Sequence, residues 1–311
     1  MPEIKNEIIA GILRELSKYL QGKEKALKLS LIAFFSRGHL LIEDLPGLGK
    51  TTLAIAIAQA LGLSFGRIQC TSDLLPTDIT GLSIFKQGKS EFEFRKGPIF
   101  SNIVLVDEIN RATPKTQSAL LEAMGEKQVT IEETTYKLAR PFFVIATQNP
   151  IEHYGTFPLP ESQLDRFMMK TGIGYPHRAA EMDIMRGGSR REALYSIKPF
   201  LNTGECIKIQ DSIRKDVYIS EKVLEYSINI IEATRTSKYL IAGVSTRGAL
   251  ALANTARANA YFNGRDYVIP EDIKELAEFT IPHRVLFKEE PDSVSKREII
   301  RSLLEKIPAP L

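Results

Sequence analysis

The chain has 311 residues, of which 43% are hydrophobic and 25% charged, proportions typical of a globular protein with room for two domains. Its net charge of +3 gives no general attraction to nucleic acid or anionic membrane. No apolar run approaches the ~18 residues of a membrane span, and the charged N-terminus is unlike a signal peptide, so we expect a cytoplasmic protein. Cys70, Cys206 and four scattered histidines show no metal-ligand or disulfide spacing, and both cysteines are expected to be buried thiols.

Apolar residues at helical spacing over residues 4–36 predict two helices before the first strand. From residue 39 to about 176, short apolar runs alternate with helical segments. Continuous apolar runs separated by helices are typical of a parallel sheet that is buried on both faces. The predicted strands lie at 40–42, 64–70, 103–106, 142–147 and 168–173.

Two stretches, near residues 80–96 and 127–139, alternate with period two and predict β-hairpins inserted into this sheet domain. A simple connection does not need alternating apolar residues, and the alternative is a hairpin that only extends a sheet edge. The paired segments are 81–86 with 91–95 around a turn near Gly88, and 128–131 with 136–138 across Glu-Glu-Thr-Thr.

After Pro176 the strand pattern ends and a helical second domain is predicted. Ser220 is typical of a helix N-cap, Gly264 of a helix stop, and Pro270 of a first helical turn. We divide the chain into a sheet domain with its preceding helices (1–176), a linker with an insert helix (177–215) and an all-α domain (216–311). The predicted helices cover 178–186, 220–235, 246–262, 270–280 and 293–306.

The sequence Leu-Pro-Gly-Leu-Gly-Lys-Thr at residues 45–51 is typical of a loop that binds nucleotide phosphates. Gly47 and Gly49 let backbone N–H groups curl around the phosphates, and Lys50 supplies a cation. Thr51 is expected to place a hydroxyl on Mg²⁺, and a helix from Thr52 to Leu61 to point its N-terminus at the phosphates. The predicted loop contacts with ATP are Pro46, Gly47, Leu48, Gly49, Lys50, Thr51 and Thr52.

One position departs from the common phosphate-loop pattern, because Asp44 stands where its first glycine usually lies. If the backbone there needs positive φ, Asp tolerates that conformation better than most residues. The loop assignment therefore stands, and the role of Asp44 remains open.

Asp107 and Glu108 follow four apolar residues, at the carboxyl end of a predicted strand, where ligands bind in open parallel sheets. We expect Asp107 to hold Mg²⁺ and Glu108 to orient or deprotonate the attacking water. A solvated acidic pair is the alternative, which the nearby phosphate loop disfavours. Asn149 ends another predicted strand and could sense the γ-phosphate, although such a residue is more often a turn former before a proline.

Several segments together resemble the MoxR family of AAA+ ATPases, and the resemblance extends over nearly the whole chain from residue 38. It implies an α/β fold: a P-loop αβα sandwich with a five-stranded parallel sheet, followed by an all-α lid domain. It also implies a homo-oligomeric ring, usually a hexamer, with ATP between subunits and both hairpins facing the pore. The segments are 43–51, 106–112, 114–124, 146–150 and 156–167, with a weaker match over 243–252.

The same resemblance assigns three residues. Arg166 matches the arginine finger that reaches into a neighbour's site, Asn149 matches the first sensor, and Arg247 matches the second sensor on the lid. Without the family, the simpler interpretation is that Arg166 pairs with Asp165 or Glu161 on a solvated helix face, and that Arg247 only caps contacts on the lid. Arg111, which lies near Glu108 in the sequence, is the alternative candidate for the role of arginine finger.

The phosphate loop and the acidic pair predict a Mg-ATP-hydrolysing ATPase. The resemblance implies a chaperone-like protein that remodels protein clients as a ring, with a partner that contains a von Willebrand factor A domain. One alternative is a nucleic-acid motor or transcription activator. The first insert lacks a Gly-Ala-Phe-Thr-Gly-Ala loop and the basic cluster at 186–191 is sparse, so no nucleic-acid partner is expected. Another alternative is a metal-chelatase motor subunit, which shares the inserts. No Asn-Lys-Xaa-Asp motif supports a GTPase.

Overall fold

The computed structural model describes residues 4–86, 91–151, 155–187, 192–288 and 296–310. Five parallel strands form one sheet in the order β2-β5-β8-β1-β9, as the apolar runs predicted. The predicted turn at Gly88 and part of the basic cluster at 186–191 lie outside the described residues. The sheet strands are β1 (Leu40–Glu43), β2 (Phe65–Gln69), β5 (Ile103–Asp107), β8 (Phe143–Gln148) and β9 (Met169–Thr171).

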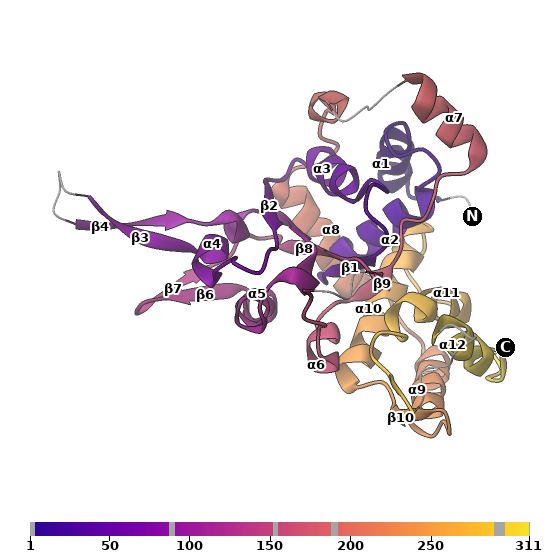
Figure 1. Cartoon of the computed structure of the whole chain (residues 1–311). Helices are drawn as coiled ribbons and strands as arrows, with labels where there is room; N and C mark the ends of the chain where they lie inside the picture. The colour runs from indigo at the N-terminus through magenta and orange to yellow at the C-terminus, as the bar shows by residue number, and fades with distance from the viewer. Residues whose placement is uncertain (1–3, 87–90, 152–154, 188–191, 289–295, 311) are drawn as a thin grey trace.

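Both faces of this sheet are buried, which explains why its strands are continuously apolar. In β5, Ile103 and Leu105 belong to one hydrophobic cluster, whereas Val104 and Val106 belong to another on the opposite face. The sheet therefore forms the middle layer between two layers of helices (Figure 1). The first cluster includes residues of α1 (Glu7–Ser17), α2 (Glu24–Phe35) and α3 (Lys50–Ala60), and the second includes residues of α4 (Pro76–Thr80) and α5 (Pro114–Glu126).

Two β-hairpins extend from the sheet domain, and Figure 1 shows both projecting on the same side of the molecule. The predicted register of the second hairpin was wrong: Ile131 pairs with Thr134, so the turn contains two residues instead of four. Glu132 in that turn has a φ of 55°, as two-residue hairpin turns commonly require. The hairpin strands are β3 (Gly81–Lys86), β4 (Glu91–Lys96), β6 (Gln128–Ile131) and β7 (Thr134–Lys137).

Aromatic rings link the two hairpins. Phe94 of β4 packs on Tyr136 of β7 with ring centroids 4.4 Å apart, and Phe100 lies edge-on to both rings. Farther out on the first hairpin, Phe85 packs against Phe92, which is 71% exposed. The hairpins therefore share an aromatic cluster, and the first presents apolar side chains to solvent.

The remaining chain is mainly helical, and the linker contains a helix that the sequence pattern missed. This helix, α8, begins with a capping box between Asn202 and Glu205 and packs on α2 and α10. The predicted N-cap at Ser220 is confirmed, since its side chain accepts a hydrogen bond from Val223 N. No helix in the described part of the chain is long and apolar enough to cross a bilayer. The elements here are α6 (Glu161–Leu164), α7 (Arg178–Gly187), α8 (Thr203–Asp216), α9 (Glu221–Arg235), β10 (Leu240–Ala242), α10 (Thr246–Phe262), α11 (Pro270–Thr280), β11 (Leu286–Phe287) and α12 (Lys296–Glu305).

A buried arginine joins the C-terminal helices to the sheet domain. Arg284, which follows α11, donates to Asp165 Oδ1 at 2.9 Å and to the backbone carbonyls of Phe167 and Met168. His283 Nε2 lies 3.0 Å from the same Phe167 carbonyl. The carboxylate and the main-chain carbonyls thus accept hydrogen bonds from the buried Arg284 guanidinium. A buried charge is stable only with partners of this kind.

Both cysteines are buried and free, as expected. Burial raises the pKa of each thiol to about 12, so neither is poised as a nucleophile.

Candidate nucleotide-binding site

The phosphate loop and the ends of β5 and β8 meet around a pocket of about 390 Å³. Gly47 and Gly49 have φ values of 82° and 94°, which glycine adopts without steric cost, and α3 begins directly after them. The loop N–H groups and the helix N-terminus therefore surround a space suited to phosphates. Among the predicted residues, its lining contains Pro46, Gly47, Gly49, Lys50, Thr51, Thr52, Asp107, Glu108 and Asn149.

A second pocket, of about 770 Å³, shares part of the loop, and Leu48 lines it. Sequence reasoning missed the rest of its lining, because those residues carry no motif and come from two distant segments, 19–23 and 175–185. Side chains such as Tyr19, Tyr175 and Met185 offer apolar surface to a base. The two adjoining pockets can together accommodate a nucleotide.

Asp107 ends β5 at the pocket wall and is hydrogen-bonded on both oxygens. Arg67 of β2 donates from Nε to Oδ2 at 2.9 Å, and the Thr147 hydroxyl donates to Oδ1 at 3.4 Å. Arg67 was not predicted from the sequence, since only the pairing of β2 with β5 brings it here. The Asp107 carboxylate is therefore held in a fixed orientation in the pocket wall.

Glu108 has a left-handed backbone, with φ of 57°, that turns the chain out of β5. Its Oε2 accepts hydrogen bonds from Gln69 of β2 at 3.1 Å and from Arg111 at 3.2 Å. Gln69 is a second β2 residue that the sequence did not reveal. Arg111, the competing candidate for the finger, thus contacts the carboxylate of its own chain.

The residues assigned to Mg²⁺ fit that ion. The described residues contain no group of three His, Cys, Asp or Glu side chains that could hold a metal. Mg²⁺ bound with a nucleotide needs only one or two protein oxygens, because phosphates and water complete its octahedron. The Thr51 hydroxyl and the Asp107 carboxylate line the same pocket and supply such oxygens.

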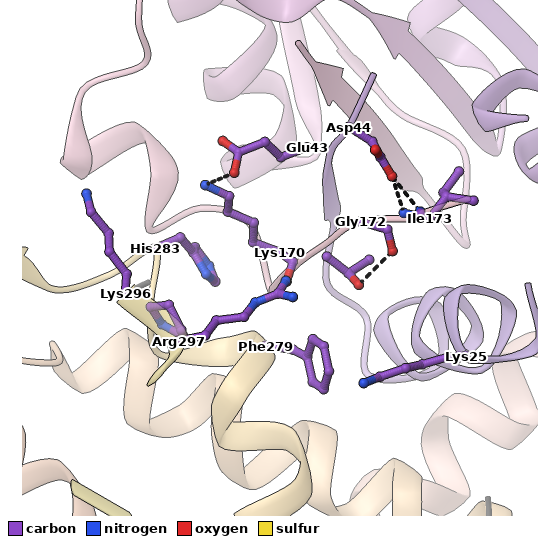
Figure 2. Close-up of a pocket in the computed structure, with 13 residues that line it drawn as sticks. Lys25, Glu43, Asp44, Lys170, Gly172, Ile173, Phe279, His283, Lys296 and Arg297 are labelled. Atoms are coloured by element: carbon purple, nitrogen blue, oxygen red, sulfur yellow. Dashed lines mark hydrogen bonds and ion pairs between the residues drawn. The ribbon is translucent and has the colours of Figure 1, made fainter. Parts of the chain in front are cut away.

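Asp44 connects the phosphate loop with the segment that follows β9. Its Oδ2 accepts from Ile173 N at 2.7 Å and Gly174 N at 2.6 Å (Figure 2), and its Oδ1 accepts from Leu45 N. Its carbonyl oxygen is contacted by Lys50 Nζ. Asp44 is not among the described residues with positive φ, so the strain considered for this position does not arise.

Asn149 forms the turn that the sequence offered as one of its two roles, and its sensor role stays a prediction. Its side-chain oxygen accepts from Ile151 N at 3.2 Å, which stabilises the turn after β8, and the residue also lines the phosphate pocket.

Arg166 and Arg247 do not line the phosphate pocket of their own chain. Both line a different pocket, of about 260 Å³, together with Lys127. Arg166 donates to the backbone carbonyl of Leu121, and it does not pair with Asp165, whose carboxylate is bound by Arg284.

Comparison with known proteins shows the family of the chain. Residues 39–169 match the model of the "ATPase family associated with various cellular activities (AAA)", and residues 232–303 match an AAA lid domain. The chain is 43% identical to the uncharacterised YeaC of Bacillus subtilis, over 98% of the chain and 95% of the relative. It is 37% identical to Chaperone MoxR1 of Mycobacterium tuberculosis, over 95% of the chain and 81% of the relative. The chain belongs to the MoxR family of AAA+ ATPases.

A solved structure extends the comparison to three dimensions. A crystal structure of a Cytophaga hutchinsonii protein described as a candidate ATPase superposes on this MoxR-family chain with a TM-score of 0.91 and 42% identity, covering 98% of this chain and 95% of the other. The predicted family and fold are confirmed, and membership implies nucleotide binding at the phosphate loop.

Proposed function

We propose that this MoxR-family chain hydrolyses Mg-ATP in a ring of identical subunits and uses the energy to remodel protein clients. One observation carries the proposal: Arg166 and Arg247 lie in a different pocket from Lys50, Asp107 and Glu108. A hydrolytic site needs a cation for the charge that develops on the transferred phosphoryl group. An adjacent subunit that presents its arginine pocket would complete the site.

In the proposed mechanism the base occupies the 770 Å³ pocket and the phosphates the 390 Å³ pocket. Lys50 exchanges its contact with the Asp44 carbonyl for the outer phosphates. Thr51 and Asp107 would hold Mg²⁺, which would supply positive charge to the phosphates. Glu108 aligns the attacking water and accepts its proton, and Asn149 holds the water or the γ-phosphate.

Arg166 is the proposed finger that acts on the ATP of the adjacent subunit, with Arg247 beside it. Removing such a cation typically lowers the rate by roughly 10³ to 10⁵. Hydrolysis is then tied to assembly, because the Arg166 of an isolated subunit does not reach that subunit's own phosphate pocket.

The client role rests on two observations. A relative is named a chaperone, and the first hairpin exposes Phe85 and Phe92 on the side toward which both hairpins project. Exposed apolar side chains of this kind bind segments of other proteins. We propose that these hairpins contact the client, and that the partner contains a von Willebrand factor A domain.

The test uses Glu108→Gln and Arg166→Ala. We expect Glu108→Gln to bind ATP with near wild-type affinity and to lose turnover, and Arg166→Ala to bind ATP and lose assembly-dependent hydrolysis. Unchanged turnover in purified Glu108→Gln would overturn the ATPase proposal. The same variant, stalled with ATP, should co-purify with the client.

A further inference from the structure

Lys127 occupies the junction between α5 and the β6–β7 hairpin. Its backbone is left-handed, with φ of 55°. Its N–H donates to Ala123 O at 2.9 Å, which closes the helix, and its carbonyl accepts from Leu138 N at 3.0 Å, which closes the hairpin base. Glycine is the usual residue at such a helix end, because other residues are strained there by about 1 kcal/mol. A long cationic side chain at this position therefore suggests a role for the charge.

Lys127 lies in the arginine pocket described above. The only acidic side chain of that pocket, among the residues the structure describes, is Asp165, which is bound by Arg284 at 2.9 Å and by Ser245 at 3.0 Å. Arg37, also in the lining, pairs with Asp211 at 2.7 Å.

Three other cations of the pocket, among the described residues, form no ion pair with a carboxylate. Across the described ranges, no carboxylate lies within ion-pair distance of Lys127, Arg166 or Arg247. Lys127 and Arg247 are exposed, so a molecule outside this chain can reach them.

The charged groups that shift the pKa of Lys127 are all of its own sign. Partial burial lowers its pKa, and the nearby Arg37, Arg140 and Arg214 lower it further, with no carboxylate acting in the opposite direction. A cluster in which positive charges outnumber carboxylates is stabilised by a bound polyanion. A polyphosphate is the anion that the proposed ring brings to this face.

We propose that Lys127 contacts the phosphates of the ATP held by an adjacent copy of this chain, beside Arg166. This inference rests on the proposed ring and names a residue of that shared site which no sequence motif indicates. Because the Lys127 carbonyl closes the base of the β6–β7 hairpin, the contact also couples the position of that hairpin to the neighbour's nucleotide. ATP hydrolysis in one subunit would therefore release the hairpin base of the next.

The principal variant is Lys127→Gly, which keeps the left-handed backbone and removes the charge. We expect a folded protein at least as stable as wild type, unchanged ATP affinity and a kcat lowered at least ~10-fold. Lys127→Arg should retain more activity than Lys127→Gly. The matched control is Lys115→Ala, an exposed lysine near the start of the same helix, which should keep wild-type kcat.

Mixing inactive variants separates this inference from the ring itself. A mixture of Glu108→Gln and Arg166→Ala tests the ring, because the first variant supplies the arginine and the second supplies the glutamate. Hydrolysis should return, to about a quarter of the wild-type rate if the subunits mix at random. Glu108→Gln with Lys127→Gly should recover likewise. Lys127→Gly with Arg166→Ala should not recover, since no subunit then presents both cations.

Each outcome decides one of the two proposals. If the first mixture stays inactive, the shared site itself is wrong, and the role of Lys127 falls with it. If the first mixture recovers, any one of three results would overturn the role of Lys127 alone. These are a wild-type kcat in Lys127→Gly, no recovery when Lys127→Gly is mixed with Glu108→Gln, and recovery when Lys127→Gly is mixed with Arg166→Ala.

Discussion

The carboxylate of Asp44 accepts a hydrogen bond from the backbone N–H of Ile173 at 2.7 Å (Figure 2). This contact assigns a role to the one residue that departs from the phosphate-loop pattern. With the contact known, we expect Asp44→Gly to lower the free energy of unfolding by about 1–3 kcal/mol, because the part-buried N–H of Ile173 and the N–H of Gly174 lose a charged acceptor. Denaturant unfolding measures this, and ATP titration shows whether the loosened loop also binds more weakly.

Asp44→Asn is the matched control, since its amide oxygen still accepts from the backbone. It should lose less stability than Asp44→Gly. Equal stabilities of Asp44→Gly and wild type would contradict the assigned role.

Gln69 donates to Glu108 Oε2 at 3.1 Å and thereby competes with the water that Glu108 is proposed to hold. A carboxylate that loses a donor becomes a stronger proton acceptor. We therefore expect Gln69→Leu to raise the basal hydrolysis rate by about 2- to 10-fold at saturating ATP. Steady-state phosphate release measures the change, and a slower Gln69→Leu would show instead that Gln69 positions Glu108.

Phe94 packs on Tyr136 at 4.4 Å and joins the two projecting hairpins. Phe94→Ala should weaken that link by about 1 kcal/mol and accelerate amide exchange in β6 and β7, with basal ATP hydrolysis nearly unchanged. Phe92→Ala, at an exposed position of the same strand, should leave exchange in β6 and β7 as in wild type. Equal exchange in Phe94→Ala and wild type would show that the hairpins are ordered independently.

His39 makes stability depend on pH. Its Nδ1 accepts from Val144 N at 3.0 Å and its Nε2 faces Met124 O at 3.3 Å, so the neutral ring fits, and burial lowers its pKa to about 4. The unfolded chain takes up the proton near pH 6.5 and the folded chain only near pH 4. Stability should therefore fall as pH drops from 6.5 to 4, by at most about 3 kcal/mol from this group.

His39→Gln keeps an acceptor for Val144 N and removes the titration. Its free energy of unfolding should vary less steeply between pH 7 and pH 4.5 than that of wild type. The free energy of unfolding of His39→Gln should still depend on pH to some extent, because burial also lowers the pKa of His283. Identical slopes would mean that His39 is not held neutral.

The sequence predicted features whose cause is local. Buried strands such as β5 are continuously apolar, and the phosphate loop needs glycines at fixed positions, so the fold class and family could be inferred and are confirmed. The site residues that the sequence did not reveal depend on the pairing of strands that are distant in the sequence. Arg67 and Gln69 reach the acidic pair only because β2 lies beside β5 in the sheet.

Other misses have a different cause. Helix α8 carries a capping box, but its weakly apolar sequence gave no strong helical period, so packing against α2 and α10 stabilises it. The second hairpin was given four turn residues because Thr134 and Thr135 are polar, although threonine is also a good strand former. The grouping of Arg247 with Arg166 follows from the placement of α10, which a single sequence does not record.

The buried contact between Arg284 and Asp165 has an evolutionary consequence. The pair lies directly beside Arg166, so either partner alone would leave an uncompensated charge next to the proposed finger. Relatives that lack the arginine at position 284 should therefore also lack the acid at position 165, and single replacements should be rare. The C-terminal helices and the segment that carries the finger would then be inherited as one unit, and chimaeras that exchange these helices between distant relatives should work only when residues 165–168 are exchanged with them.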